Sequence, residues 1–312
     1  MTHPLISIII PCYNAERWLA ATLESALAQT WPNKEIIFVN DGSNDDSLSV
    51  AQGFSARGVH VIDQPNRGAS AARNAGLHVA RGEYIQYLDA DDLLAPDKIE
   101  QQMRLIEPLR NRVISSGRWI RFHEKPEKVL FTDQVNYRDL TGIEFLQLHW
   151  EEGCMMHPAA WLAPRELLDD AGPWNESLTL NDDGEYFARV MLVAERIIFC
   201  NNAYTYYRTH SGPRLSVCRD RRALESLYYS VELSTGYLLA ADTSSLSRAA
   251  VAYAWKWTAF ELYPDATDLA LLAENHSKRL GGSNRAFPAG LKFQILSKLL
   301  GWRLARRLSA KW

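Results

Sequence analysis

The sequence has few cysteines, and they stand too far apart to form a structural framework. The 312 residues include four, and no two of them form a C-x-x-C pair. Small disulfide-stabilised folds and structural zinc sites both depend on such closely spaced thiols. We therefore expect neither, and interpret the cysteines as buried thiols. The four are Cys12, Cys154, Cys200 and Cys218.

Long apolar runs are also missing. The opening run, residues 6–10, is too short for the apolar core of a signal peptide and has no basic residues before it. A membrane helix needs roughly 18 or more apolar residues in succession, and the sequence has no such segment. Because of these two absences, we expect a cytoplasmic protein. We also expect it to be globular, because 47% hydrophobic residues are enough for a full core.

Acidic residues are missing from residues 275–312. Of the 34 Lys and Arg residues, nine lie in this segment and 25 precede it, and all 37 acids precede it too. The acidic body argues against broad binding to nucleic acid. The basic tail also carries Phe293, Leu299, Leu300 and Trp302, so it is a candidate for contact with an anionic membrane surface.

What the sequence does have, over residues 1–100, is an alternation of β-branched runs and helical patterns. The runs are apolar on both faces, which predicts a mostly parallel sheet with helices on both sides. Asn14 is placed to cap the first helix, in which Leu19, Leu23 and Leu27 recur at helical spacing. A helix through Arg73 follows the third run. The predicted strands are residues 6–11, 35–41, 59–63 and 83–92, with another at 112–122.

The residues that follow these strands should gather at one edge, because ligands of parallel sheets bind beyond the carboxyl ends of the strands. They are Tyr13 and Asn14, Asp41 and Gly42, residues 66–73, and residues 89–92.

The last set holds three acids, Asp89, Asp91 and Asp92, within four positions. Ionised carboxylates this close repel one another. One interpretation is a Mg2+ or Mn2+ ion, which binds one or two carboxylates together with substrate phosphates. The other is that Asp92 caps the next helix while its neighbours lie in water. The acids alone leave both open.

Asp41 and Arg73 have two interpretations each. Asp41 can accept a hydrogen bond from a base or a sugar hydroxyl, but Asp-Gly-Ser is also an ordinary turn sequence. Arg73 lies in the first turns of a predicted helix, where it can bind phosphate or remain a solvated charge.

Four ordered segments resemble the nucleotide-sugar-binding half of the family 2 inverting glycosyltransferases, which have the GT-A fold. They are SIIIPCYNAERWL, EIIFVNDGSNDDS, NRGASAARNAG and GEYIQYLDADD, and they extend over about residues 4–100. The resemblance implies a layered α/β GT-A catalytic domain over residues 1–218. Residues 1–100 would form its donor half and residues 101–218 its acceptor half. The helical patterns of residues 219–312 predict a C-terminal extension.

The resemblance also implies roles for individual residues. Tyr13 and Asp41 would hold the nucleotide base, and Arg73 would lie near base or phosphate. Asp89 and Asp91 match the DxD motif, so they would contact the ribose and a Mn2+ or Mg2+ ion bound to the diphosphate. The implied donor-binding residues are Pro11, Tyr13, Asp41, Arg73, Asp89 and Asp91, with Asp89 and Asp91 as metal ligands.

One departure concerns the nucleotide. The family often has Asp-Asp-Gly-Ser where this chain has Asn40-Asp41-Gly42-Ser43. Asn keeps an acceptor but loses the charge, so uridine diphosphate is the first choice while guanosine and thymidine diphosphates stay open.

Residues 172–190 resemble a later family motif, in which an acidic pair precedes a helix that ends in an Arg six positions after the second acid. Asp183 and Arg189 have this spacing. The resemblance implies that Asp183 is the general base that deprotonates the acceptor. Asp182 stands where Glu is common. The alternative is that Asn181 or Asp182 only caps the helix.

Other residues are candidates for contact with the acceptor or the diphosphate. His157 and His210 lie in segments that the family places there, although a lone His is more often structural. Trp174, with Trp150 and Trp161, is a candidate stacking wall for a sugar, although most tryptophans belong to the core. Asp182 is a further candidate for contact with the acceptor or the diphosphate.

The expected function is metal-dependent, inverting transfer of a hexose-type sugar from a nucleotide-diphosphate donor. The acceptor would be a saccharide or a lipid-linked molecule, in cell-surface polysaccharide or glycan synthesis. One rival is a nucleotidyltransferase, which the lack of a Gly-rich, basic phosphate loop after residues 6–11 disfavours. The other is a non-catalytic nucleotide-sugar-binding protein.

The tail is expected to form one final helix after a linker at residues 281–290. Leu291, Ile295, Leu299 and Trp302 would share one side of it, and Lys and Arg residues a neighbouring arc. Peripheral contact with an anionic membrane is one interpretation, and packing against the catalytic domain or a partner chain is the other.

Overall fold

The computed structural model describes residues 3–109, 112–126, 132–209, 217–287 and 289–309. The chain forms two compact units. The first comprises Met1–Phe145, Cys154–Glu176 and Arg189–Gly212, and the second comprises Leu146–Gly153, Ser177–Ala188 and Pro213–Trp312. Helices α5 (Gly142–Glu152) and α7 (Asp182–Val193) have residues in both.

Five strands form the main sheet of the first unit, in the order β3-β2-β1-β4-β7. The first four are parallel, and β7 pairs antiparallel with β4. All seven residues of the central strand β1 are buried, as expected for a sheet covered on both faces. The predicted parallel sheet is therefore confirmed. The strands are β1 (Ile6–Cys12), β2 (Lys34–Asp41), β3 (Val59–Gln64), β4 (Tyr84–Tyr87) and β7 (Ala163–Pro164).

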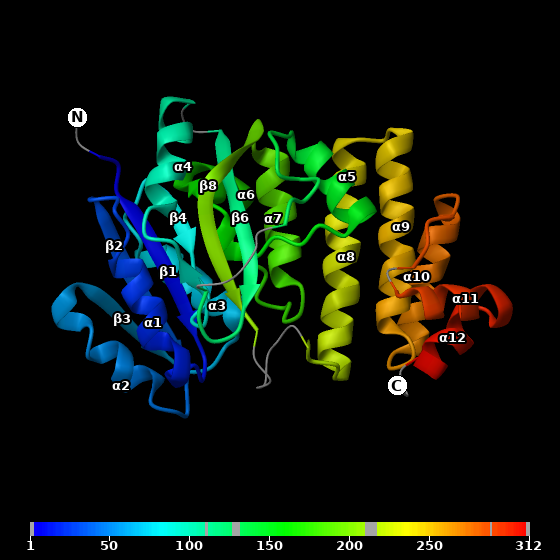
Figure 1. The fold of residues 1–312 in the computed structure, drawn as a ribbon, viewed down its shortest axis with the longest axis horizontal. Coiled ribbons are helices and arrows are strands. Elements are labelled where there is room, and N and C mark those ends of the chain that lie inside the picture. The colour runs from blue at the N-terminus through cyan, green and yellow to red at the C-terminus, as the bar shows by residue number, and fades with distance from the viewer. Residues whose placement is uncertain (1–2, 110–111, 127–131, 210–216, 288, 310–312) are drawn as a thin grey trace. The chain divides into compact units, whose positions relative to one another are not determined.

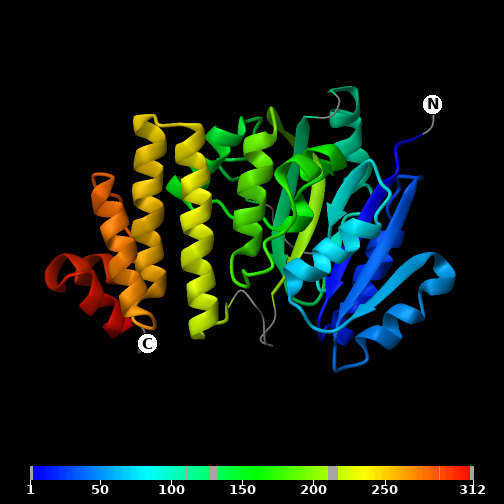
Figure 2. The ribbon, with the colours of Figure 1, turned by 180° about the vertical axis from the view of Figure 1, so that it is seen from behind.

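Helices cover the two faces of this sheet. Helices α1 (Glu16–Leu27) and α2 (Ser47–Gln52) lie in front of the sheet in Figure 1, and α3 (Ala69–Val79) lies on its other side, as Figure 2 shows. Leu19 and Leu23 of α1 share a buried cluster with Ile8. On the opposite face Gly76 of α3 lies so close to Ile9 that a Cβ there would stand 2.4 Å from a methyl carbon. The glycine allows α3 to approach the sheet.

A second, smaller sheet has the strand order β5-β8-β6. Strand β6 (Val113–Phe122) runs parallel to β8 (Arg196–Arg208), with a register shift after Gly117. The two-residue strand β5 (Leu93–Leu94) pairs antiparallel with β8 directly after the acidic residues 89–92. The strand expected at residues 112–122 is thus confirmed, but it lies outside the main sheet. This unit also contains helices α4 (Lys98–Ile106) and α6 (Arg165–Ala171), the first residues of α5 and the last residues of α7. Short 3-10 turns lie at Ser55–Arg57, Glu107–Leu109 and Pro158–Ala160.

The expected cap of the first helix is wrong. Helix α1 begins at Glu16, and its N-cap residue is Ala15, without a side-chain hydrogen bond. Asn14 instead adopts a positive φ of 53°, which Asn tolerates better than most residues. Its Oδ1 accepts the backbone N–H of Asn44 at 2.7 Å. Asn14 therefore ties the turn after β1 to the turn after β2.

Three long helices dominate the second unit: α8 (Arg221–Ala241), α9 (Ser245–Leu262) and α10 (Thr267–Arg279). Asp220 caps α8 by accepting the N–H of Ala223, and Ser244 caps α9 by accepting that of Ser247. Among the described residues, no helix is long and apolar enough to cross a membrane. The expected burial of the cysteines is confirmed for Cys12, Cys154 and Cys200 and is wrong for Cys218, which is partly exposed.

The tail forms two helices and not the expected single one. Helix α11 (Leu291–Leu300) ends at Gly301, whose φ of 76° suits glycine, and α12 (Trp302–Ser309) follows. The break turns Trp302 inward, against Phe260 and Phe287. Trp302 therefore does not share a side with Leu291, Ile295 and Leu299.

Candidate active site

The carboxyl ends of the parallel strands lie in register at one edge of the main sheet. Cys12 pairs with Asn40, and Asn40 pairs with Asp63. Tyr13, Asp41 and Asp89 come at or just after these strand ends, so the sheet brings them to the edge where ligands of parallel sheets bind.

Asp41 fixes the loop that leads from β3 into α3. Its buried carboxylate accepts the backbone N–H groups of Arg67 at 2.9 Å and Gly68 at 2.8 Å, and the side-chain amide of Gln64 at 2.7 Å. Gly42 turns the chain immediately after it with a φ of 70°, and a Cβ at Gly42 would stand 2.6 Å from the Asn66 nitrogen. Asp41 thus anchors the loop, and its contact with a base stays a prediction.

The contacts of Asn40 explain why its side chain is an amide and not a carboxylate. Its Nδ2 donates to Oδ1 of Asp63 at 2.7 Å, and its own Oδ1 accepts the N–H of Ser43 at 3.3 Å. An aspartate at this position would place a second carboxylate against Asp63 without a proton between them. The contact with Asp63 on the neighbouring strand therefore accounts for an asparagine at this position, where the family often has the first aspartate of Asp-Asp-Gly-Ser.

Tyr13 is the exposed aromatic residue at the end of β1. Its side chain is 51% exposed, and its hydroxyl accepts a long hydrogen bond of 3.5 Å from Asn44. Pro11, two residues earlier, is buried within β1. A half-exposed aromatic face at this edge can stack on a planar base.

Arg73 of α3 forms an ion pair with Asp89. The Nη2 atom lies 2.9 Å from Oδ1, and the Arg73 side chain is only 7% exposed against 28% for Asp89. The guanidinium also lies over the ring of Trp174 at 4.4 Å, and that buried ring packs edge-on against Tyr87. Arg73 is therefore not a solvated helix charge, and that interpretation is wrong.

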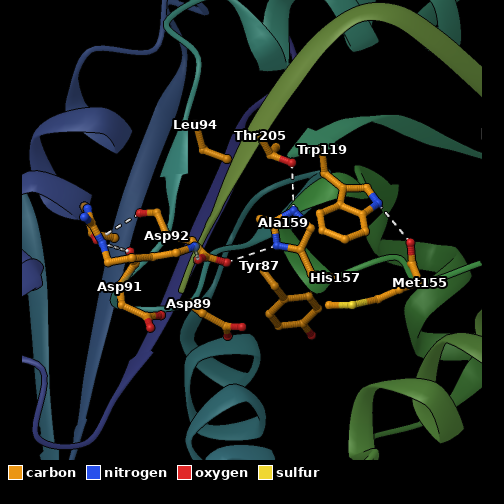
Figure 3. Close-up of polar contacts among 12 residues, drawn as sticks. Tyr87, Asp89, Asp91, Asp92, Leu94, Trp119, Met155, His157, Ala159 and Thr205 are labelled. Carbon is orange, nitrogen blue, oxygen red and sulfur yellow. Dashed lines mark hydrogen bonds and ion pairs between the residues drawn. The ribbon is translucent and has the colours of Figure 1, made fainter. Parts of the chain in front are cut away.

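Asp92 is the buried member of the acidic turn. Its Oδ1 accepts the backbone N–H of Arg208 at 2.7 Å, and its Oδ2 lies 3.0 Å from Nδ1 of His157 (Figure 3). Burial, followed by the charge of Asp89, raises the pKa of Asp92 well above its usual range. The expectation that Asp92 caps the next helix is wrong, because the N-cap residue of α4 is Asp97.

His157 connects this turn to the second sheet. Its Nε2 lies 2.8 Å from the hydroxyl of Thr205 on β8, and its ring packs against Trp119 and Tyr207. In Figure 3 the Asp92 carboxylate points toward His157, whereas the carboxylates of Asp89 and Asp91 lie on the lower side of the view. The ring is buried, so His157 supports the turn from behind. Its contact with acceptor or phosphate stays a prediction.

Arg208 is a site residue that the sequence reasoning missed. Its buried guanidinium lies between the rings of Trp18 and Phe122, at 4.4 Å and 4.3 Å from their centroids. Its Nε donates to the carbonyl of Asp91 at 2.7 Å. Burial lowers its pKa, and the charges of Asp91 and Asp92 oppose that shift. The available signal was a segment with three tyrosines, Tyr204, Tyr206 and Tyr207, that ends at an arginine.

Asp89 and Asp91 remain as the partly exposed acids of the turn. Carboxylate oxygens suit Mg2+ or Mn2+, and such ions commonly take one or two carboxylates with the rest from water and substrate phosphates. The described residues contain no group of three or more His, Cys, Asp or Glu side chains placed to hold a metal. Two carboxylates are a donor set that fits an ion which takes its other ligands from water and substrate phosphates. His210, another candidate for contact with the acceptor or the diphosphate, lies outside the described residues.

Asp182 and Asp183 open helix α7, where the helix dipole favours negative charge. Asp182 is buried and Asp183 is partly exposed, with its Oδ1 accepting the N–H of Gly184 at 2.9 Å. Asn181 has a positive φ of 62°, and its amide donates to Ser230 of α8. The role of Asp183 as a base stays a prediction.

Arg189, six positions after Asp183, has a structural contact in the first unit. Its guanidinium donates to the carbonyls of Gly172 at 3.2 Å and Pro173 at 2.8 Å, and also to that of Ala171. It does not end the helix as expected, because α7 continues to Val193. The arginine of the motif thus clamps the chain after α6.

The three tryptophans proposed as a stacking wall differ in burial. Stacking on a sugar needs an exposed ring face, and Trp161 and Trp174 are almost fully buried. Trp150, on α5, is only partly buried.

Comparison with known proteins agrees with this arrangement. The model of "Glycosyl transferase family 2" matches residues 7–171, which is more than half of the chain. The chain belongs to glycosyl transferase family 2. The family expected from the four segments is confirmed. The family model includes the sheet, the acidic turn and His157, but ends before Asp182.

Several bacterial glycosyltransferases are similar to this chain in sequence. "Glycosyltransferase GlyG" of Streptococcus pneumoniae is 30% identical over 236 residues, which cover 67% of this chain and 72% of the relative. Other relatives are longer: the match covers only 28% to 32% of three uncharacterized Rickettsia glycosyltransferases that are each 31% identical. The chain thus spans about a third of the length of those proteins.

Solved structures share the fold. S. aureus TarS 1-349, solved with UDP-GlcNAc, matches 98% of this chain and 91% of its own with a TM-score of 0.72 at 18% identity. The mannosyltransferase PcManGT from Pyrobaculum calidifontis, solved with GDP-Man and Mn2+, matches 100% and 88% with a TM-score of 0.56 at 15% identity. The GT-A fold with a helical C-terminal region is therefore confirmed.

Proposed function

We propose that the chain is a metal-dependent, inverting glycosyltransferase that moves a sugar from a nucleotide-diphosphate donor to a saccharide or lipid-linked acceptor. Cell-surface polysaccharide or glycan synthesis is the process we propose for it. The catalytic domain would comprise residues 1–218, with the donor half at 1–100, and residues 219–312 would form the helical extension.

The acidic turn is the observation that carries the proposal. Asp92 is held by Arg208 and His157, and this leaves Asp89 and Asp91 partly exposed at the ligand-binding edge of the sheet. These two residues would hold Mn2+ or Mg2+ together with the donor diphosphate. When bound, the ion would stabilise the negative charge of the leaving diphosphate as a Lewis acid.

The rest of the edge supports a nucleotide at the same place. The exposed ring of Tyr13 can stack on a base, and Asp41 holds the loop before α3 in position. Pro11 would define the end of β1 beneath the base. Arg73 would help to neutralise the charge of the diphosphate, because its fixed guanidinium is next to Asp89.

Uridine diphosphate is our first choice of nucleotide, and guanosine diphosphate is the main alternative. Of the two solved neighbours, TarS 1-349 was solved with UDP-GlcNAc and PcManGT with GDP-Man. Asn40 donates to Asp63, so this chain places a carboxylate one strand away from where the family often has it. That difference bears directly on which nucleotide base the site recognises.

Asp183 would act as the general base. The acceptor hydroxyl must lose its proton as its oxygen attacks the anomeric carbon from the side opposite the diphosphate, which inverts that carbon. Asp183 is an acid at the start of a helix and is partly exposed, so it is accessible to an acceptor. Asp182, His157, His210 and Trp174 remain secondary candidates for acceptor or phosphate contacts.

We also propose that the protein works in the cytoplasm, at the inner face of the membrane. A lipid-linked acceptor would be met there, and the basic C-terminal helices would make the contact.

Two measurements test the proposed function. Thermal shift with a panel of nucleotide sugars, in Mn2+ and in EDTA, should show stabilisation by one nucleotide class and only with the metal. With the donor so identified, NMR of the transfer product or of slow donor hydrolysis should show an anomeric configuration opposite to that of the donor. Retention of configuration, or binding without any turnover, would contradict the proposal.

A further inference from the structure

Helices α11 and α12 expose an unusual number of aliphatic side chains. Leu291 and Leu299 are 77% and 76% exposed, and Ile295 lies between them at the four-residue spacing of one helix face. Leu304 and Leu308 repeat this spacing on α12. We call this set the leucine face; its members are Leu291, Ile295, Leu299, Leu300, Leu304 and Leu308.

These side chains are not needed for the core of the unit. The inward side of the two helices already packs through Phe293, Trp302 and Ala305 against Phe260 of α9 and Phe287. Helix α11 therefore has apolar residues on the side that faces its own unit and on the side that faces away from it. Monomeric proteins rarely expose so many neighbouring aliphatic groups without a binding partner.

The charges beside the leucine face are positive. Lys298 and Arg307 are exposed on the same two helices, and residues 275–312 contain no acid. An aliphatic surface with basic residues around it matches a bilayer that carries anionic headgroups. We propose that the leucine face inserts into the headgroup region of an anionic lipid bilayer, with α11 and α12 lying in the plane of the membrane.

A second copy of the chain is a poorer partner. In a twofold contact the same patch meets itself, so Lys298 and Arg307 would approach their own copies. Residues 275–312 contain no acid to compensate for that repulsion, and Glu274 of α10, which directly precedes them, is already paired with Arg303 of α12. A bilayer supplies both the apolar interior and the opposite charge.

Helix α11 ends at Gly301, and Trp302 packs into the core while Leu304 and Leu308 remain exposed on α12. We infer that the exposed residues of both helices insert together. The inference extends the membrane contact proposed above, but it concerns binding alone and needs no donor or acceptor.

Flotation of the full chain with lipid vesicles tests the proposal. Wild-type protein should float with vesicles that contain phosphatidylglycerol, and much less with phosphatidylcholine alone. The double variant Leu291→Ser/Leu299→Ser should bind at least about tenfold more weakly. Lys298→Gln and Arg307→Gln should each weaken binding about fivefold, and more salt should act in the same direction.

Leu246→Ser is the matched control, because Leu246 is also an exposed leucine of the second unit but lies on α9. It should float like the wild type. Equal flotation of the Leu291→Ser/Leu299→Ser variant would overturn the proposal. So would a concentration-dependent dimer in sedimentation velocity that this variant loses, because the face would then belong to a second copy. Donor-induced thermal shift of the same samples reports separately on the transferase site.

Discussion

The Nδ1 atom of His157 lies 3.0 Å from Oδ2 of Asp92, and both side chains are almost completely buried. The other oxygen of Asp92 accepts the backbone N–H of Arg208 at the end of β8. Asp92 follows Asp91 directly in the chain. The position of the two proposed metal ligands is therefore fixed by a pair of contacts made behind them and out of reach of solvent.

His157→Leu should consequently weaken Mn2+-dependent donor binding, by about tenfold or more. It should also lower the free energy of unfolding by about 1–3 kcal/mol, because Asp92 loses a buried partner. His157→Asn is the matched variant: its amide can reach the place of Nδ1 and donate to Asp92. Isothermal titration calorimetry should show partial recovery in His157→Asn only, and equal donor affinity in all three proteins would contradict a positioning role.

Arg73→Lys should weaken donor binding although the charge is kept. A lysine cannot both lie flat on Trp174 and donate to Asp89, which Arg73 does. The loss of a charged hydrogen bond corresponds to roughly 10- to 100-fold in affinity. Arg81→Lys, an exposed arginine at the other end of the same loop–helix segment, is the control and should bind donor normally. Calorimetry that finds Arg73→Lys indistinguishable from this control would assign Arg73 to packing alone.

Asp183→Asn should abolish most transfer while donor binding is retained. A general base contributes about 100-fold or more to the rate, and it acts on the acceptor, not on the donor. Asp169→Asn, at an exposed aspartate outside the proposed site, is the control and should keep normal turnover. Turnover measured with saturating donor, beside donor affinity from calorimetry, separates the two effects. Normal turnover in Asp183→Asn would move the base elsewhere, and no turnover in the wild type would favour a non-catalytic binding protein.

Lys98 makes a pH-dependent contribution to stability. Its buried amine donates to Gln86 and to the carbonyl of Trp161, and burial lowers its pKa well below the usual value. In the window between that lowered pKa and the usual one, the unfolded chain binds a proton that the folded chain does not. The contribution of Lys98 to the free energy of unfolding therefore rises with pH, by at most about 1.4 kcal/mol per pH unit.

The thermal midpoint of the wild type should therefore rise relative to that of Lys98→Met as the pH increases from about pH 7 to about pH 10. Lys125→Met, at an exposed lysine, should show no such trend. A constant difference between wild type and Lys98→Met would mean that Lys98 stays charged in the fold.

The sequence predicted the features that depend on local pattern. Buried β-branched runs indicated the parallel strands, and the parallel strands placed Tyr13, Asp41 and Asp89 at one edge. It did not predict the support of the acidic turn. His157 and Arg208 stand 65 and 116 positions from Asp92, and no local periodicity reports a contact over such a separation.

Two local predictions failed for conformational reasons. Asn14 was expected to cap a helix, but its left-handed backbone places its side chain against Asn44. Gly301 was read as part of a helix, yet its positive φ ends α11 and reorients Trp302. A sequence shows that such residues tolerate the left-handed region, but the surrounding packing decides whether they adopt it.

The central claim is that Asp91 holds a divalent ion together with the donor diphosphate. Calorimetric titration with the nucleotide sugar that gives the largest thermal shift tests it most directly, in Mn2+ and in EDTA, for wild type, Asp91→Asn and the exposed control Asp169→Asn. Wild type and Asp169→Asn should bind the donor only with Mn2+, and Asp91→Asn should lose that metal-dependent binding. Equal donor affinity in Mn2+ and EDTA for the wild type, or unchanged Mn2+ dependence in Asp91→Asn, would contradict the claim.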